Sequence, residues 1–232
     1  LRAALPDAIM KVMTSSGALV DAASLVPKDT ILSGPAGGVV GAAHVATGAG
    51  FDKAIGFDMG GTSTDVSRYG GQFERRYEMD VEDPDTGGQQ RIVAPVLAIE
   101  TVAAGGGSIC DFDGMKPTVG PESAGADPGP ACYGRDGPLT ITDVNVFLGR
   151  VPPDMFPFPL HRRAVETRLV RLIERIAATT GRRYDPHELA AGYISIANAH
   201  MAAAIRKTSV QRGYDPREHV LVSFGGAGGQ HA

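Results

Sequence analysis

The stretch Phe57-Asp58-Met59-Gly60-Gly61-Thr62-Ser63-Thr64-Asp65 decides the fold. It continues the apolar run that begins at Ala54, which predicts a buried strand, and it opens a second strand at Thr64. The two glycines between these strands let the main chain approach a ligand without an intervening side chain. Successive N–H groups of Gly60, Gly61 and Thr62 can form a concavity that binds an anion. The hydroxyls of Thr62, Ser63 and Thr64 add short donors, so the stretch predicts a phosphate-binding loop.

Two carboxylates flank this loop. A carboxylate beside a polyphosphate is repelled unless it holds Mg²⁺ or the water shell of that ion. We therefore assign Asp58 as the magnesium ligand and as a catalytic residue, and Asp65 as a second catalytic candidate. The alternative is a Gly-Gly hairpin turn with an incidental aspartate.

The loop differs from a P-loop, which needs G-x-x-x-x-G-K-[ST] before a helix, because no lysine lies between residues 58 and 65. The order strand, Asp-x-Gly-Gly-Thr, strand is instead similar to the phosphate loops of the actin, sugar kinase and Hsp70 superfamily of ATPases. In that superfamily two related domains each supply one phosphate loop, and a glycine turn receives the adenosine. The segment Phe224-Gly225-Gly226-Ala227-Gly228-Gly229 resembles that turn, so Gly225, Gly226, Ala227 and Gly228 are expected to bind nucleotide. A plain strand-to-helix turn is the alternative.

The periodicity of the chain predicts an α/β fold with a mixed sheet flanked by helices. Strands are expected at 8–13, 54–58, 64–69, 72–79 and 219–224, with 54–79 forming a three-stranded meander. Small residues predict a helix over 36–46, for which Ser33 can cap and Pro35 suits the first turn. An amphipathic pattern predicts a helix over 162–180 that stops at Gly181. Asp185 begins another helix, which is apolar on nearly all sides and extends to about Gln211.

Composition excludes several classes of partner. The chain has 232 residues, a formal net charge of -4 and no run of lysine or arginine, which gives no electrostatic reason to expect nucleic acid. No apolar run is long enough to span a membrane, and no signal peptide is recognisable. Two cysteines without metal-ligand spacing fit a cytoplasmic protein. Because neither nucleic acid nor a membrane is expected as a partner, a small molecule is the expected partner.

The 31 glycines are clustered, and their share of the chain is nearly double the usual value of about 7%.

Six blocks spread along the chain resemble the hydantoinase A and 5-oxoprolinase family. They are LSGPAGGVVGA from Leu32, DMGGTSTDVSRYGG from Asp58, IETVAAGGGSI from Ile99, PESAGADPGPACYG from Pro121, LTITDVNVFLGR from Leu139 and FGGAGGQHA from Phe224. Members of that family open a cyclic amide, such as 5-oxoproline or a hydantoin, at the cost of ATP. The resemblance implies phosphoryl transfer to an amide or enol oxygen, with ATP and Mg²⁺ as cofactors and a cyclic amide as substrate. It also implies an actin-like (ribonuclease H-like) ATPase domain.

The departures from the family suggest a domain organisation. Family members begin with a separate domain that carries another Asp-x-Gly-Gly-Thr loop, whereas this chain has one such loop, at Asp58. We therefore expect a central fragment, truncated at both ends. Residues 1–50 are interpreted as a strand and helix continuing a preceding domain. Residues 51–232 are interpreted as the ATP-binding domain, with a Gly/Pro-rich insertion of loops around short strands at about 80–140.

Further candidates lie near the other glycine turns. The backbone of Gly105, Gly106 and Gly107 can approach the nucleotide or the substrate. Glu100 and Asp143 are carboxylates that are either functional or structural, and the sequence leaves both interpretations open. His200 lies on an apolar helix and is expected in the core, whereas His231 directly follows the adenosine turn and is the better site candidate.

Two other functions remain open at this stage. The first, also within the family, is the ATP-binding subunit of an acetone or acetophenone carboxylase. The second is a nucleotide-gated module without enzymatic activity, since chaperones and actins share the fold. A hydantoinase B-type partner and an oligomeric state are further expectations of the resemblance.

Overall fold

A computed structural model describes residue 4 and residues 8–82 and 87–231 of the chain. The chain forms two compact units, each built from three segments. The first unit contains Leu1–Gly56, Ser67–Glu100 and Gly213–Val222, and the second contains Phe57–Val66, Thr101–Arg212 and Ser223–Ala232.

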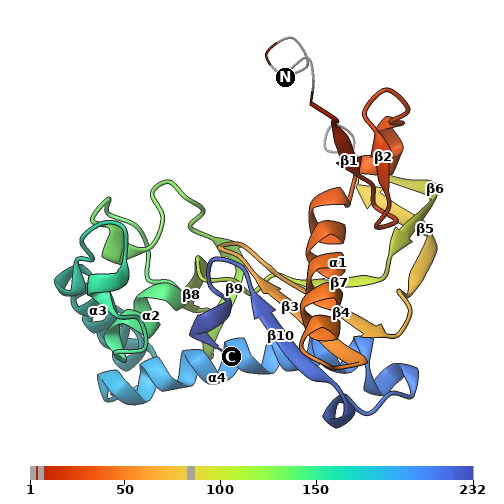
Figure 1. Cartoon of the computed structure of the whole chain (residues 1–232). Helices are drawn as coiled ribbons and strands as arrows, with labels where there is room; N and C mark the ends of the chain where they lie inside the picture. Colours follow the sequence, from red (N-terminus) through yellow and green to blue (C-terminus); the bar gives the residue numbers. More distant parts are fainter. Residues whose placement is uncertain (1–3, 5–7, 83–86, 232) are drawn as a thin grey trace. The chain divides into compact units, whose positions relative to one another are not determined.

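A four-stranded sheet confirms the predicted mixed α/β architecture (Figure 1). Its order is β10-β3-β4-β7, with bounds Val220–Phe224, Lys53–Met59, Thr64–Gly70 and Ile99–Val102. Strands β3 and β4 are neighbours joined by residues 60–63, and so short a connection requires antiparallel strands. Strand β10 runs parallel to β3, because the N–H of Ala227, just beyond β10, donates to the carbonyl of Met59 at the end of β3.

The predicted three-stranded meander is wrong at its third strand. Strand β5 (Arg75–Glu82) leaves the sheet and pairs antiparallel with β6 (Gln89–Leu97). Only an isolated bridge between Tyr69 and Phe73 forms at the Gly70-Gly71 turn. The free side of β4 is occupied instead by β7, a short strand from the segment 80–140, for which we expected loops around short strands.

Helix α1 (Ser33–Gly48) provides the core of the first unit. Ala36 and Val39 pack there with Leu97, and Met13 and Phe73 cover them. Pro35 lies in the first turn as expected, but Ser33 is not the cap. Residue Leu32 holds that position, and its N–H donates to the hydroxyl of Ser15 at 2.9 Å. No side chain caps the first turn, and a serine 17 residues away accepts the N–H of the N-cap residue instead.

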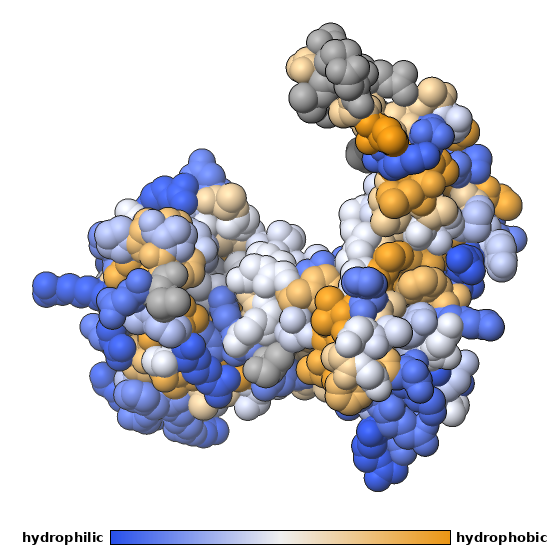
Figure 2. All heavy atoms as spheres, viewed as in Figure 1, coloured by the Kyte–Doolittle hydropathy of each residue, from blue (hydrophilic) through white to orange (hydrophobic). Residues whose placement is uncertain are grey.

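The remaining elements of the first unit are small and partly apolar at the surface. Strands β1 (Lys11–Met13) and β2 (Leu19–Asp21) form a two-stranded sheet, followed by the 3₁₀ helix Pro27–Thr30. Figure 2 shows hydrophobic residues at the surface of this part. Ile9, Leu19 and Val45 are 86%, 62% and 60% exposed.

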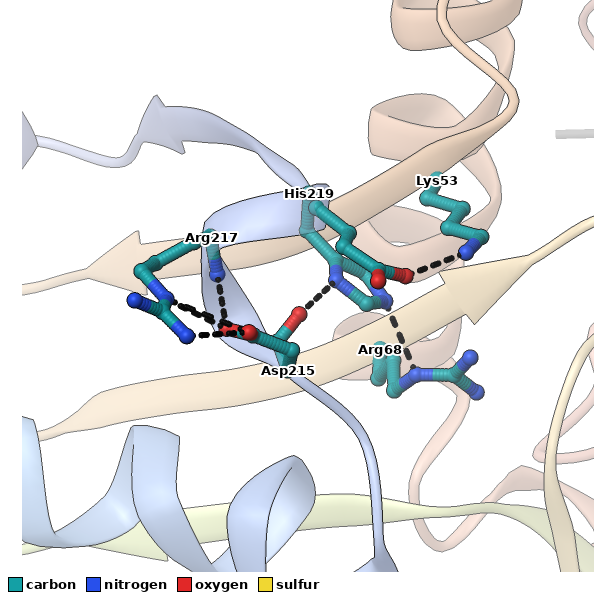
Figure 3. Close-up of polar contacts among 6 residues, drawn as sticks. Lys53, Arg68, Asp215, Arg217 and His219 are labelled. Carbon is teal, nitrogen blue, oxygen red and sulfur yellow. Dashed lines mark hydrogen bonds and ion pairs between the residues drawn. The ribbon is translucent and has the colours of Figure 1, made fainter.

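A polar cluster around Arg68 connects strand β4 with the segment just before β10 (Figure 3). The Arg68 Nε donates to Nε2 of His219 at 3.0 Å, and its guanidinium pairs with Glu74 at 2.6 Å. The same guanidinium lies 3.3 Å from the centre of the Tyr214 ring. Nδ1 of His219 lies 2.9 Å from the carbonyl of Asp215. With only 9% of its side chain exposed, Arg68 has a partner on each side, which is typical of a structural role.

The second unit also contains the β8–β9 hairpin and the helices α2, α3 and α4. Strands β8 (Ser108–Phe112) and β9 (Pro117–Ser123) are antiparallel. Helix α4 (Pro186–Thr208) packs on β9, on α2 (Ile141–Phe147) and on α3 (Arg162–Thr180). The short 3₁₀ helices of the rest of the chain are Ala131–Tyr133, Pro153–Met155, Val210–Arg212, Pro216–Glu218 and Gly228–Gln230.

The predicted ends of these helices are largely confirmed. Gly181 closes α3 in the left-handed conformation with φ 75°, and the Asp185 side chain accepts the N–H groups of His187 and Glu188 at the start of α4. Helix α4 ends at Thr208, before the predicted Gln211, and a 3₁₀ turn follows. Among the described helices, none combines the length and apolar content needed to cross a membrane.

Candidate functional site

The glycine clusters that stood out in the sequence meet within the second unit. The N–H of Gly106 donates to the carbonyl of Gly60 at 3.0 Å, and the N–H of Gly107 donates to the carbonyl of Gly61 at 2.6 Å. A Cβ on Gly105 would lie 2.7 Å from the carbonyl group of Gly61. Glycine is therefore required here by the close approach of two main-chain segments, as expected for a site built from backbone.

The third glycine cluster joins the other two beyond strand β10. The N–H of Ala227 donates to the carbonyl of Met59 at 2.8 Å. Gly225 has φ +87°, and a Cβ there would lie 2.5 Å from the Met59 carbonyl oxygen and would also strike the Asp58 carboxylate. The turn after β10 and the loop after β3 are thus packed backbone to backbone.

A pocket of about 180 Å³ lies where these segments meet. The three predicted glycine segments line this pocket together with α2 and the loops that contain Gly125, Pro130 and Phe156. The lining residues are Gly61, Gly106, Gly107, Gly125, Pro130, Tyr133, Thr142, Phe156, Gly226, Ala227 and Gln230. Backbone and small side chains dominate the lining, which leaves room for a compact polar group.

The backbone donors of the predicted phosphate loop differ in availability. The N–H of Gly60 donates to the Ser63 carbonyl at 2.9 Å, which closes the turn. The Thr64 side chain is fully buried, and its hydroxyl donates to the Ala104 carbonyl at 2.5 Å. These two groups are therefore occupied within the fold. In the described part of the chain, the exposed Gly61 and Thr62 have N–H groups without a hydrogen-bond acceptor.

The carboxylates of Asp58 and Asp65 lie at the same loop. Asp58 is partly buried, and this burial, together with the negative charge of Asp65, raises its pKa. Asp65 accepts a hydrogen bond from the Thr101 hydroxyl at 2.6 Å. A cation would relieve the unfavourable ionisation of Asp58. The described residues contain no cluster of three or more metal-ligating side chains, so an ion here would need water or phosphate oxygens as additional ligands.

The other candidate carboxylates have structural partners. Asp143 is fully buried and accepts the N–H groups of Ala131, Cys132 and Thr140 at 3.0, 2.7 and 2.8 Å. The hydrogen bond with Thr140 caps α2, and the other two hold the 3₁₀ turn Ala131–Tyr133 against this helix, which favours the structural interpretation that the sequence left open. Glu100 forms an ion pair with Arg76 at 3.7 Å in the first unit.

The expectation for His200 is wrong, because this residue is exposed. The nearby Ala199 and Ala203 are exposed as well, so this side of α4 is not buried. His200 lines a second pocket of about 680 Å³, beside β9 and Lys116.

His231 is held in a polar network next to the glycine pocket. Its Nδ1 lies 2.7 Å from Asn198 Oδ1, and its Nε2 lies 3.3 Å from Asn145 Nδ2. Burial, with a smaller contribution from Arg150, lowers the pKa of His231 to about 4. Sequence reasoning missed Asn145 and Gln230 in this network. The signal for Asn145 was a polar residue inside the otherwise apolar stretch 144–148, Val-Asn-Val-Phe-Leu.

Comparisons with known proteins show which family the chain belongs to. A family model described as Hydantoinase/oxoprolinase matches residues 1–232. The 5-oxoprolinase of Saccharomyces cerevisiae is 44% identical over 240 residues, which are 97% of this chain and 18% of that protein. The caprolactamase subunit alpha of Pseudomonas jessenii is 38% identical over 207 residues, 88% of this chain and 28% of that protein.

Two solved structures are also similar. Nucleotide-free acetone carboxylase has a TM-score of 0.79 and 29% identity, covering 96% of this chain and 31% of that chain. ATP-dependent caprolactamase from Pseudomonas jessenii has a TM-score of 0.77 and 35% identity, covering 95% and 32%. The chain spans less than a fifth of the length of the 5-oxoprolinases that it matches.

Proposed function

Because this chain belongs to the hydantoinase/oxoprolinase family, we propose that the protein of which it is part is an ATP-dependent hydrolase of a cyclic amide, such as 5-oxoproline or a hydantoin. In this proposal the chain supplies one part of the nucleotide site. The observation that carries it is the convergence of three glycine segments on one small pocket, with two unpartnered N–H groups and two carboxylates at the same loop.

Each group at the pocket has a proposed task. The N–H groups of Gly61 and Thr62 bind phosphate oxygens, and the turn at Gly225–Gly228 lies against the adenosine. The Asp58 carboxylate holds Mg²⁺, a role that fits its raised pKa. Magnesium ATP would supply the phosphoryl group that turns an amide oxygen into a leaving group. The chain itself contributes positioning and charge neutralisation, on which phosphoryl transfer depends.

The proposal includes an organisation for the larger protein. Residues 1–50 continue a preceding domain, and 51–232 belong to the ATP-binding domain. One relative is named as the alpha subunit of a caprolactamase, which supports a second, hydantoinase B-type subunit or domain and an oligomer here as well.

An assay on the full-length protein tests the activity. ADP release would be measured with 5-oxoproline, hydantoin and caprolactam, each with and without Mg²⁺. We expect one of these amides to stimulate ADP release and to be converted to the ring-opened product in equal amounts. ADP release that no cyclic amide stimulates would contradict the proposal.

The ATP-binding subunit of a carboxylase is the second candidate, and a specific observation favours it. The fold matches acetone carboxylase as well as it matches caprolactamase, with TM-scores of 0.79 and 0.77. Acetone-dependent and bicarbonate-dependent ADP release, measured in the same assay, would select this alternative.

A further inference from the structure

We infer that Gln230 is a ligand-binding residue of the glycine pocket, whose side-chain NH₂ donates to a phosphate oxygen, and that Asn145, His231 and Asn198 form a relay that orients it. This inference rests on the proposed nucleotide site and adds a specificity-determining side chain to a pocket built mostly of backbone. Four residues from three elements carry it: α2, α4 and the turn that follows β10.

The hydrogen bond between Asn145 and Gln230 fixes the Gln230 side chain. Asn145 Nδ2 donates to Gln230 Oε1 at 3.0 Å. The carbonyl oxygen of Gln230 therefore faces α2, and its NH₂ group points away. Nε2 lies 3.9 Å from the position that a Cβ on Gly106 would occupy. Both Gln230 and Gly106 line the pocket, and among the described hydrogen bonds none uses this NH₂ group. An unpartnered double donor is thus presented beside the predicted phosphate loop.

The geometry also fixes the protonation of His231. Asn145 Nδ2 has only hydrogens to offer, so Nε2 of His231 must accept at 3.3 Å. The ring proton then lies on Nδ1 and is donated to Asn198 Oδ1 at 2.7 Å. With Gln230 oriented as above, turning the Asn145 amide over would place its oxygen against Gln230 Oε1, which is unfavourable. A neutral His231 therefore keeps Asn145 turned toward Gln230.

Asn145 occupies a buried position although its Oδ1 atom has no hydrogen-bond donor. Its side chain is fully buried, and its Oδ1 has no hydrogen-bond partner in the described structure. A buried acceptor without a donor destabilises a fold, and such exceptions in native structures call for an explanation. Here the Asn145 NH₂ group contacts both Gln230 and His231, which an apolar side chain at this position could not do.

The volume of the pocket and its donors indicate which class of ligand the Gln230 NH₂ group would bind. A volume of about 180 Å³ suits a phosphate-sized group and is small for a whole nucleotide. Gly61, whose N–H has no acceptor among the described hydrogen bonds, lines the same pocket, so a second donor is available beside Gln230. An anion with several oxygens, such as a phosphate group of ATP, matches such a set.

Binding measurements on the full-length protein test the inference. Calorimetric titrations would use a non-hydrolysable ATP analogue, inorganic phosphate and adenosine. The variant Gln230→Glu keeps the shape and replaces the donor by an anion, so we expect the Kd for the analogue to rise about 10-fold or more. Adenosine binding should change less than about 2-fold, because adenosine carries no phosphate. Gln230→Met removes the donor without adding charge, and the exposed Gln211→Glu controls for the charge change alone.

The relay has its own set of variants. His231→Gln can place an oxygen near Nε2 and should bind the analogue like the wild type, whereas His231→Leu should weaken binding. The double variant Gln230→Glu/His231→Leu should bind no more weakly than Gln230→Glu, because both changes act through one donor. Additive losses would show that His231 acts independently and would overturn the relay.

The other possible outcomes of these titrations also test the inference. Analogue binding that is unchanged in both Gln230→Glu and Gln230→Met would overturn the ligand contact, and an equal loss for adenosine would overturn its phosphate specificity. A wild-type protein that binds adenosine and ATP but shows unaltered affinities in every variant defeats this inference alone. A wild-type protein that binds no nucleotide defeats the proposed function and this inference with it.

Discussion

The Asp58 carboxylate lies at the end of β3, where burial and the charge of Asp65 both raise its pKa. Asp58→Asn in the full-length protein should keep the fold, because the side chain is nearly isosteric and Gly60 and Gly61 set the turn. Loss of one preorganised electrostatic contact commonly costs about 10² to 10³ in rate. We expect such a loss in amide-dependent ADP release, with an unchanged or slightly raised thermal midpoint. Both quantities are measured on the same preparation.

The exposed Asp52, just before β3, supplies the control for this change. Asp52→Asn removes the same charge away from the pocket and should leave the rate within about 2-fold of the wild type, as surface substitutions usually do. Near-normal turnover of Asp58→Asn would show that Asp58 only forms the turn.

His231 predicts a dependence of stability on pH. Its pKa is lowered to about 4 in the folded protein, against an ordinary value of about 6.5. Between these values the unfolded chain binds more protons than the native state, so stability falls as pH decreases from 6.5 toward 4 and is constant above 6.5. The difference in thermal midpoint between wild type and His231→Gln should therefore change between pH 7.5 and 4.5, with the variant losing less. Parallel curves would contradict the burial of a neutral His231.

The turn after β10 gives a prediction at the scale of an element. Gly225 has φ +87° and lies against Met59 and Asp58, so Gly225→Ala combines backbone strain with a steric clash. A non-glycine residue in such a conformation costs about 1–3 kcal/mol, and the clash should also displace Asp58. We expect a lower thermal midpoint together with weaker ATP binding.

The neighbouring glycine offers a matched control. A Cβ on Gly226 would contact nothing within 4 Å, so Gly226→Ala should leave the thermal midpoint nearly unchanged. Equal destabilisation by the two substitutions would mean that the turn is sensitive to any side chain and not to the packing of β10 on β3.

Local patterns predicted the elements better than they predicted the partners of those elements. The apolar periodicity of α3, the Asp185 cap and the strand before Gly225 were all recognisable because each signal lies within one segment. Strand β5 was misplaced because a strand pattern does not specify its neighbour, and β6 competed for the pairing. His200 was misplaced because the small residues around it suit a buried or an exposed helix surface equally well.

The glycine segments of the candidate site were also predicted from local sequence patterns. The three glycine segments were recognised from their spacing, and the structure brings them to one pocket. Asn145 and Gln230 were missed because their contact joins positions 85 residues apart. Asp143 shows the same limit, since its side chain also accepts the N–H groups of Ala131 and Cys132, which lie 12 and 11 residues away in the sequence.

At the scale of the whole molecule, the size of the glycine pocket limits what this pocket can enclose when the chain is alone. Sites for drug-sized ligands and cofactors enclose about 300–1,000 Å³, whereas this pocket encloses about 180 Å³. The 5-oxoprolinases that the chain matches are more than five times as long. Both observations support a nucleotide site completed by parts of the protein outside these 232 residues.

The last prediction follows from this incomplete enclosure. The 232-residue chain, expressed alone and shown to be folded by circular dichroism, should bind magnesium ATP more weakly than the full-length protein and should show no amide-dependent ADP release. Positioning of reacting groups can supply about 7–11 kcal/mol of a lowered barrier, so a site that holds only part of the nucleotide forfeits much of the rate. Titration of both proteins with the same non-hydrolysable analogue measures the first effect, and the ADP assay measures the second. Robust turnover by the isolated chain, dependent on a cyclic amide, would place the entire catalytic site within these residues and would contradict the division of the site proposed above.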